Sequence, residues 1–328
     1  MMNKKTINHI DKLIESCSKD CSVLNNMAIV PKRDGQKTYY VGESFDKILG
    51  RIIRSQFDNI RKAFDLDDTE QMRKLFHDAV CGNGNEWMEI NQLNSSALLS
   101  FLCFCRVSSD RHITVGEEEY DQVMFEVRSP LEKVGRNHPV SNMDVVLLND
   151  NSALFVESKF SEYLAPKDFI VSPYYNKYYG EIFADKLTFS GFKFIENEHK
   201  WEADKNGEYK NGVYLEGIKQ MISHYLGLRY SSKDRDKWCG GLFKDKKIKL
   251  AEILYKFGAN EDTEEFESYA KASRQIFSRL SQDAKENGIE IFMNILTYQE
   301  VFSDVKNASL LPESVGKFYK LGEYCSAP

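Results

Sequence analysis

Residues 141–160, SNMDVVLLNDNSALFVESKF, constrain the fold more strongly than any other stretch of this chain. Two apolar runs, VVLL and ALFV, stand on either side of the polar segment Asn149-Asp150-Asn151. Apolar runs of this length separated by turn-forming residues predict two neighbouring strands joined by a tight turn. The second run is almost continuously apolar, which is typical of a strand in the middle of a sheet. The stretch therefore predicts a hairpin at the centre of the fold.

This hairpin also carries charged residues that packing alone does not require. Glu157 and Lys159 are two positions apart, so on a strand they point to the same face. A turn at residues 149–151 sets Asp144 obliquely across from Glu157, on the neighbouring strand. Burying such charges costs desolvation free energy, which proteins usually carry for metal binding or catalysis. Asp144, Glu157 and Lys159 are therefore the candidate site residues.

The alternative is an ordinary salt-bridged pair of strands, because exposed strands often contain Glu-x-Lys. We favour the functional interpretation for two reasons. The residues that flank Glu157 and Lys159 are apolar, and an aspartate stands upstream on the partner strand.

Two carboxylates beside an ammonium suit magnesium-dependent hydrolysis of a phosphodiester. Mg²⁺ prefers oxygen ligands, keeps several waters and needs only one or two carboxylates. Asp144 and Glu157 would supply these, and the backbone carbonyl of Ser158 would add one more oxygen. Lys159 would hold or activate the attacking water and stabilise the charge on phosphorus. Mn²⁺ is an expected substitute for Mg²⁺.

The rest of the chain predicts one α/β domain with helical additions. Among the 328 residues there is no internal repeat and no Pro-rich or Gly/Ser-rich linker. We expect an N-terminal helical region over residues 1–80, packed on an α/β domain over 81–328 that contains an insertion at 161–212. Within these regions the apolar spacing predicts helices over 43–76 (broken at 65–69), 98–104, 214–230 and 266–288, and strands over 121–127, 247–257 and from 289 onward.

Composition excludes several other classes of protein. A formal net charge of −6 disfavours a general nucleic-acid coat, although a locally basic cleft is compatible with it. The seven cysteines form no Cys-x-x-Cys and the six histidines form no His-x-x-x-His, so neither a disulfide framework nor a zinc site is expected. No apolar run approaches the roughly 20 residues that cross a bilayer, and the N-terminus has no apolar signal core. We expect a soluble, cytoplasmic protein that does not bind a membrane.

The order of these elements resembles the PD-(D/E)XK nuclease superfamily, which has the restriction-endonuclease-like fold. The motif is a strand with Asp144, a strand with Glu157-Ser158-Lys159, and a following helix with a glutamine. The closest similarity is to bacterial putative restriction endonucleases with the segments NSSAL and SNMDVVLL…FVESKF. It covers roughly residues 86–300 by order of elements. Met143 stands where many members have proline before the aspartate.

The resemblance implies roles for particular residues. Asp144 and Glu157 would be magnesium ligands and Lys159 the catalytic lysine. Gln220 in GIKQMISHYLG would be the helical glutamine that supports the metal or the phosphate, with a solvent-facing glutamine as the alternative. The related Gln-x-x-x-Tyr pattern is imperfect, because His224 stands at the tyrosine position. The family often has a glutamate on the first core helix, for which the candidates are Glu86 and Glu89.

Together these features predict a metal-dependent endonuclease that hydrolyses DNA in restriction or defence. A homodimer is considered if both strands of a duplex are cut. One alternative is a catalytically inactive nucleic-acid-binding protein of the same fold. The other is a protein-binding module in which the three charges form an ion-pair cluster. That module predicts no magnesium binding and a loss of stability in Glu157→Gln, whereas the nuclease interpretation predicts magnesium binding and a gain.

Overall fold

The computed structural model describes most of the chain. The described residues are 4–17, 21–31, 37–42, 45–46, 51–52, 56–81, 89–132, 139–170, 191–198, 200–203, 209, 212–257, 263–292 and 294–325.

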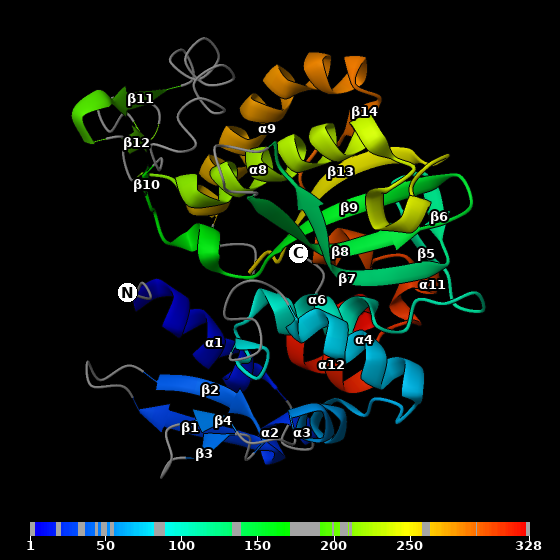
Figure 1. Cartoon of the computed structure of the whole chain (residues 1–328). Coiled ribbons are helices and arrows are strands. Elements are labelled where there is room, and N and C mark those ends of the chain that lie inside the picture. The colour runs from blue at the N-terminus through cyan, green and yellow to red at the C-terminus, as the bar shows by residue number, and fades with distance from the viewer. Residues whose placement is uncertain are drawn as a thin grey trace.

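A six-stranded mixed sheet forms the centre of the molecule (Figure 1). Its strand order is β14-β13-β9-β8-β7, with β15 also paired to β13. The strands are β7 (Gln122–Pro130), β8 (Val140–Leu148), β9 (Ser152–Lys159), β13 (Lys247–Leu254), β14 (Ile289–Ile291) and β15 (Leu296–Thr297). The strands β7, β8 and β9 are antiparallel, whereas β13 runs parallel to β9, β14 and β15. This confirms the predicted α/β class with a mixed central sheet flanked by helices.

The predicted central hairpin is the pair β8–β9. Its turn forms because the Asn149 side-chain oxygen accepts hydrogen bonds from the backbone N–H groups of Asn151 (2.8 Å) and Ser152 (2.7 Å). Every residue of β9 is buried. The continuous apolar run thus marks a strand covered on both faces.

Helices cover both faces of the sheet. On one face lie α8 (Leu215–Ser231), which contacts β7, β8 and β13, and α9 (Thr263–Glu286) (Figure 1). On the other lies α6 (Ser96–Phe104), which contacts β8 and β9 and is buried from Leu98 to Phe104. The Ser95 hydroxyl caps α6 by accepting from the Leu98 N–H. Because α6 lies between the sheet and α4 (Glu70–Val80), it is apolar all round.

The N-terminal region contains strands as well as the predicted helices. Its helices are α1 (Lys4–Ser16), α2 (Ser22–Asn25), α3 (Gln56–Phe64) and α4, and its strand pairs are β1 (Met27–Pro31) with β2 (Lys37–Val41) and β3 (Phe45–Asp46) with β4 (Arg51–Ile52). The prediction of helix from residue 43 was wrong at β3 and β4, where Phe45 pairs with Ile52 across two short antiparallel strands. The runs MAIVP and KTYYV are rich in β-branched and aromatic residues, which favour strands. The boundary at residue 80 stays a prediction.

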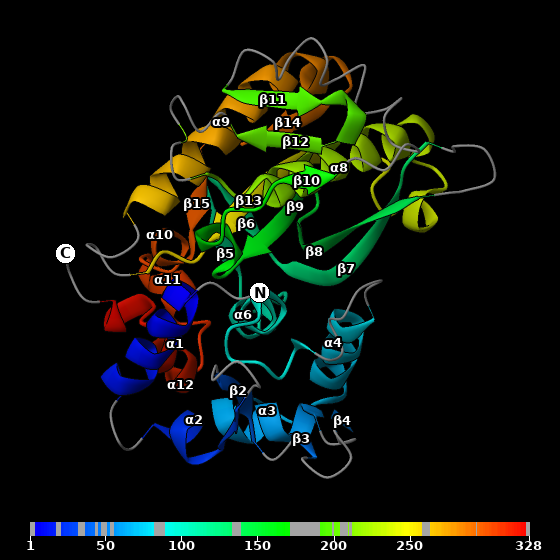
Figure 2. The same cartoon turned by 90° about the vertical axis from the view of Figure 1, so that its left-hand side faces the viewer.

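The predicted insertion at 161–212 contains a small sheet of its own. Its strands follow the order β10-β12-β11, and Figure 2 shows them beside α8, which contacts β10 and β12. The elements are η1 (Glu162–Leu164), β10 (Phe169–Ile170), β11 (Phe192–Ile195), η2 (Glu196–Glu198) and β12 (Lys200–Ala203).

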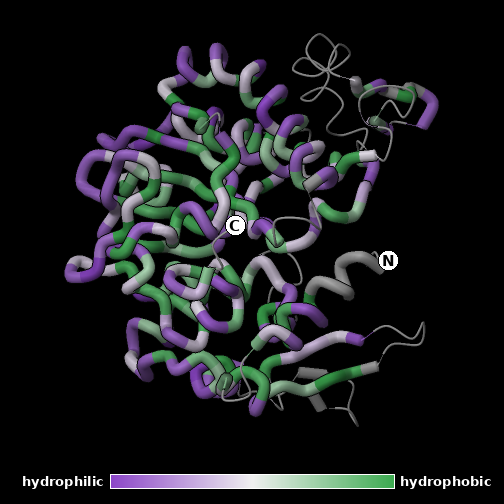
Figure 3. The backbone as a smooth tube through the Cα atoms, turned by 180° about the vertical axis from the view of Figure 1, so that it is seen from behind, coloured by the Kyte–Doolittle hydropathy of each residue, from purple (hydrophilic) through white to green (hydrophobic). Residues whose placement is uncertain are grey.

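The remaining short elements complete the core. They are β5 (Ile113–Val115), β6 (Glu118–Tyr120), η3 (Ser232–Asp234), η4 (Trp238–Gly241), α10 (Tyr298–Val301), α11 (Val305–Ala308), α12 (Glu313–Tyr319) and η5 (Gly322–Tyr324). Figure 3 shows hydrophobic residues along the inner strands and hydrophilic residues on the outer turns. None of the helices within the described ranges combines the length and apolar character that spanning a membrane requires.

Candidate active site

The site lies where β8 and β9 stop pairing. The two strands pair from Leu148↔Ala153 to Val145↔Val156, and the next position in this register would set Asp144 opposite Glu157. The ladder ends there. The backbone N–H of Ser158 donates instead to Asp144 Oδ2, at 2.7 Å. The Asp144 carboxylate therefore lies between the two separating strands.

Glu157 and Lys159 point from β9 toward α8, on the same face as the sequence predicts. Their side chains are 2% and 5% exposed. Lys159 Nζ donates to Glu157 Oε1, and His224 Nε2 on α8 lies 2.5 Å from Glu157 Oε2. Both oxygens of Glu157 are thus paired within the protein.

His224 extends this network to β8. Its Nδ1 lies 2.5 Å from the Ser141 hydroxyl oxygen, so the ring bridges Ser141 and Glu157. Serine, histidine and glutamate are the residue types of a nucleophilic triad. Ser141, however, is only 5% exposed and lies under α8. A Cβ atom at Gly227 would lie 3.3 Å from the Cβ of Ser141, so helix and strand touch at this point. Ser141 therefore supports His224 and is covered from any substrate.

The environment of the cluster shifts the pKa values of its two central carboxylates, Glu157 and Asp144, in opposite directions. Burial alone would raise the pKa of Glu157, but Lys159 and His224 lower that pKa to about 2. Burial, followed by repulsion from Glu157 and Glu126, raises the pKa of Asp144 well above its ordinary value. Burial opposes the charge on Lys159, yet Glu157 and Asp144 raise its pKa. The cluster holds a firm ion pair and an adjacent carboxylate that is repelled by its neighbours.

Glu126 on β7 is a part of this environment that sequence reasoning missed. Phe125 pairs with Val145 and Val127 with Met143, which sets Glu126 beside Asp144. Glu126 has a φ of 50°, in the left-handed region that non-glycine residues seldom adopt inside a strand. The glutamate within the strand pattern VMFEV was visible in the sequence, but only the β7–β8 register shows that it lies beside Asp144.

Glu252 on β13 is a second acid that sequence reasoning missed. It is fully buried and pairs in register with Glu157. Its Oε1 accepts from the Tyr269 hydroxyl at 2.5 Å, whereas none of the described residues makes a hydrogen bond of ordinary geometry to Oε2. Burial raises the pKa of Glu252 to about 7. The sequence feature that could have indicated this buried acid is the single glutamate in the strand KIKLAEIL.

The resemblance named three further residues. Gln220 lies on α8 one turn before His224, is half-buried, and has a buried Oε1 atom that no residue in the described ranges bonds. It is therefore not a simple solvent-facing glutamine. Glu89 is exposed, and its charge adds to burial in raising the pKa of Tyr40 on β2. Glu86 lies outside the described residues.

The donor set is compatible with one Mg²⁺ ion. No group of three His, Cys, Asp or Glu side chains within the described ranges is arranged as a metal site, but Mg²⁺ needs only one or two carboxylates. None of the described residues bonds to Asp144 Oδ1. The Lys159 carbonyl accepts from the Tyr255 N–H on the β13 side, so strand alternation turns the Ser158 carbonyl toward β8 and Asp144. A cation there would also relieve the repulsion that raises the pKa of Asp144.

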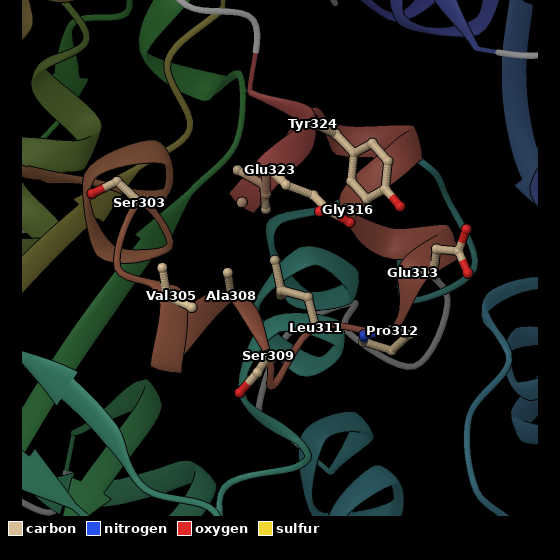
Figure 4. Close-up of a pocket in the computed structure, with 12 residues that line it drawn as sticks. Ser303, Val305, Ala308, Ser309, Leu311, Pro312, Glu313, Gly316, Glu323 and Tyr324 are labelled. Atoms are coloured by element: carbon tan, nitrogen blue, oxygen red, sulfur yellow. The ribbon is translucent and has the colours of Figure 1, made fainter.

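A cavity lies elsewhere in the molecule. It has a volume of about 710 Å³ and is lined by residues of the C-terminal segment between Ser303 and Tyr324 (Figure 4). None of its lining residues belongs to the acid cluster. It carries no part of the argument for this site.

Comparison with known proteins identifies the family. No curated protein and no solved structure matches the chain. A family model described as "Restriction Endonuclease associating with ARP" matches residues 52–320, which begins inside the predicted N-terminal region and includes the whole central sheet. The predicted restriction-endonuclease-like resemblance is thereby confirmed, and the chain belongs to this restriction endonuclease family.

Proposed function

We propose that this protein is a Mg²⁺-dependent endonuclease of the PD-(D/E)XK type that hydrolyses phosphodiester bonds of DNA. One observation carries the proposal. Asp144 meets the buried Glu157–Lys159 pair where two central strands separate, in a chain of a restriction endonuclease family.

Each residue has a distinct task in this proposal. Asp144, Glu157 and the Ser158 carbonyl would hold Mg²⁺, with Mn²⁺ as a substitute. A bound ion supplies charge neutralisation and a more acidic water. Lys159, if Glu157 Oε1 bound the ion in its place, would direct its ammonium at the attacking water and the phosphate oxygens. Gln220 would orient water or phosphate from α8.

The reaction is a balanced hydrolysis. The water oxygen bonds to phosphorus as the bond from phosphorus to one bridging oxygen breaks. The water loses one proton, and the leaving oxygen gains one. The products are a phosphate monoester and a free hydroxyl.

A cleavage assay tests the proposal directly. Supercoiled plasmid is incubated with the wild-type chain and Mg²⁺ or Mn²⁺, then with EDTA, and in parallel with Asp144→Asn. Nicked or linear DNA should appear only with the wild-type chain and metal. DNA binding without cleavage under all metal conditions would contradict the proposal and favour the inactive nucleic-acid-binding alternative.

The pairing of Glu157 removes one test that separated the nuclease from an ion-pair module. The expected gain in stability on Glu157→Gln is replaced by an expected loss, because Glu157 is bonded to both Lys159 and His224. Its substitution should lower stability under either interpretation. Asp144, whose pKa is raised by burial and then by repulsion from Glu157 and Glu126, is the position at which removal of a charge should stabilise the metal-free protein.

Two partners follow from the same proposal. The family description names an association with ARP, and we propose such a partner for this chain. Co-purification of ARP with the wild-type protein is the test. A homodimer would place one site on each strand of a duplex, and light scattering of the protein with and without DNA would show it.

A further inference from the structure

We propose that His224 is a positioning residue that fixes Glu157 for the metal ion by holding one of its two carboxylate oxygens. This inference rests on the proposed function and assigns a role to a residue that does not itself contact the ion or the DNA.

The first observation is the geometry of the ring. His224 is 4% exposed, and its two nitrogens lie 2.5 Å from Glu157 Oε2 and 2.5 Å from the Ser141 hydroxyl oxygen. Since an ionised carboxylate only accepts hydrogen bonds, Nε2 is the donor to Glu157. The Ser141 hydroxyl then holds the opposite side of the ring, so both nitrogens are occupied and the ring orientation is fixed.

The second observation is the way in which α8 is held against the sheet. A Cβ atom at Gly227 would lie 3.0 Å from the Ser129 carbonyl oxygen, closer than nearly all real contacts of this kind. Glycine therefore lets this turn of α8 approach β7 and β8 closely. His224 stands less than one turn earlier on the same helix, so the close approach also sets its distance from Glu157.

The third observation is the difference between the two partners of Glu157. Lys159 reaches Oε1 through a flexible four-carbon chain from the same strand. His224 reaches Oε2 from another element and is braced by Ser141. If Oε1 bound the ion in place of Lys159, Oε2 would stay on His224. The carboxylate would therefore keep its orientation, and Lys159 would become available for the phosphate.

Two substitutions of His224 separate its effect on the orientation of Glu157 from its effect on general packing. The amide nitrogen of glutamine reaches as far as Nε2 of histidine, so His224→Gln keeps a donor for Glu157. The amide of asparagine reaches only as far as Nδ1, so His224→Asn keeps the Ser141 side and loses Glu157. The exposed His77 provides the matched control, His77→Asn.

The measurements are Mn²⁺ affinity by calorimetry without DNA, the Mg²⁺ concentration for half-maximal cleavage, and kcat at saturating Mg²⁺. For His224→Asn we expect Mn²⁺ affinity to fall, and the Mg²⁺ concentration for half-maximal cleavage to rise, by about 10–100-fold. The kcat should be largely recovered at saturating Mg²⁺. His224→Gln and His77→Asn should remain near wild type. Circular dichroism checks that each variant is folded.

Several results would overturn the inference. One is wild-type Mn²⁺ affinity in folded His224→Asn, and another is equal loss in His224→Gln and His224→Asn. If His224→Asn does not fold, Ser141→Ala decides: a weaker Mn²⁺ affinity supports the inference and an unchanged affinity overturns it. A wild-type chain that binds no Mn²⁺ and cuts no DNA overturns the proposed function as well, which distinguishes the two failures.

Discussion

Lys159 and Lys249 are both buried lysines of the central sheet, on β9 and β13, and they lie among different carboxylates. Lys249 Nζ is 2.9 Å from Glu118 and 3.3 Å from Glu290, whose side chains are 31% and 60% exposed. Lys159 is bonded to the almost fully buried Glu157 and is also influenced by Asp144 and Glu162.

The carboxylates around the two lysines differ in their acidity. Near Lys249, burial opposes ionisation of Glu118, but Ser152 and Lys249 lower its pKa. Near Lys159, the pKa of Glu157 is lowered while those of Asp144 and Glu252 are raised. Lys249 bridges two carboxylates that solvent can reach. The Lys159 cluster buries its surplus of acids away from solvent, which is the condition that a cation would relieve.

The largest expected effect separates the two lysines by activity. Lys159→Ala should reduce the plasmid cleavage rate by about 10²–10³-fold, because it removes a charge directed at the phosphate. Lys249→Ala should keep the wild-type cleavage rate and lose about 1–3 kcal/mol of unfolding free energy, because Glu118 loses its partner. Initial rates and urea unfolding measure both. Equal loss of activity in the two variants would remove the distinction.

The next effect separates the two acids of the site by stability without metal. Glu157→Gln should lower the free energy of unfolding by about 3 kcal/mol, since Lys159 and His224 lose a buried partner. Asp144→Asn should raise it by about 1 kcal/mol, because it removes repulsion and keeps an oxygen for the Ser158 N–H. Urea unfolding in EDTA measures both. Destabilisation of similar size in both variants would contradict the unequal pairing.

A pH series compares Glu252 with Glu118. The pKa of Glu252 is raised from 4.5 to about 7, so the folded state binds the proton more tightly. The contribution of Glu252 to the free energy of unfolding is fully present below pH 4.5 and is lost as the pH rises through about 7, a change of about 3 kcal/mol. The stability of Glu252→Gln relative to wild type should therefore rise by that amount from pH 4.5 to pH 8 in EDTA.

Glu118 should show the opposite sign in the same series. Its pKa is lowered, so its contribution is present above its unfolded pKa and is lost as the pH falls. Glu118→Gln should lose least stability, relative to wild type, at the acidic end. If stability relative to wild type changed with pH in the same direction in both variants, the difference between the two clusters would be contradicted.

The smallest effect concerns the opposite face of β9. The Tyr298 hydroxyl lies 2.7 Å from the Ser158 hydroxyl on the α6 side of the sheet. Tyr298→Phe should lose about 1 kcal/mol of unfolding free energy and leave the cleavage rate unchanged. A large fall in kcat would show that the site extends through the sheet.

Features that depend on local patterns were predictable from the sequence. The hairpin β8–β9, the strand β13 and the helix α8 follow from apolar spacing and turn residues. The shared face of Glu157 and Lys159 follows from the two-residue period of a strand.

The missed features depend on contacts between segments that are distant in sequence. Glu126 reaches Asp144 only through the β7–β8 register, and Glu252 neighbours Glu157 only because β13 lies parallel to β9. The bonds of His224 require α8 to pack across β8, with a separation of 67 residues from Glu157. Periodicity gives the face of each element but not its partner.

The most direct test of the central claim is anomalous diffraction from crystals soaked in Mn²⁺. The account predicts one strong peak about 2.1 Å from oxygens of both Asp144 and Glu157, absent in Asp144→Asn. No peak between these side chains in the wild-type crystal, or a peak only at an exposed pair such as Glu118 and Glu290, would contradict it.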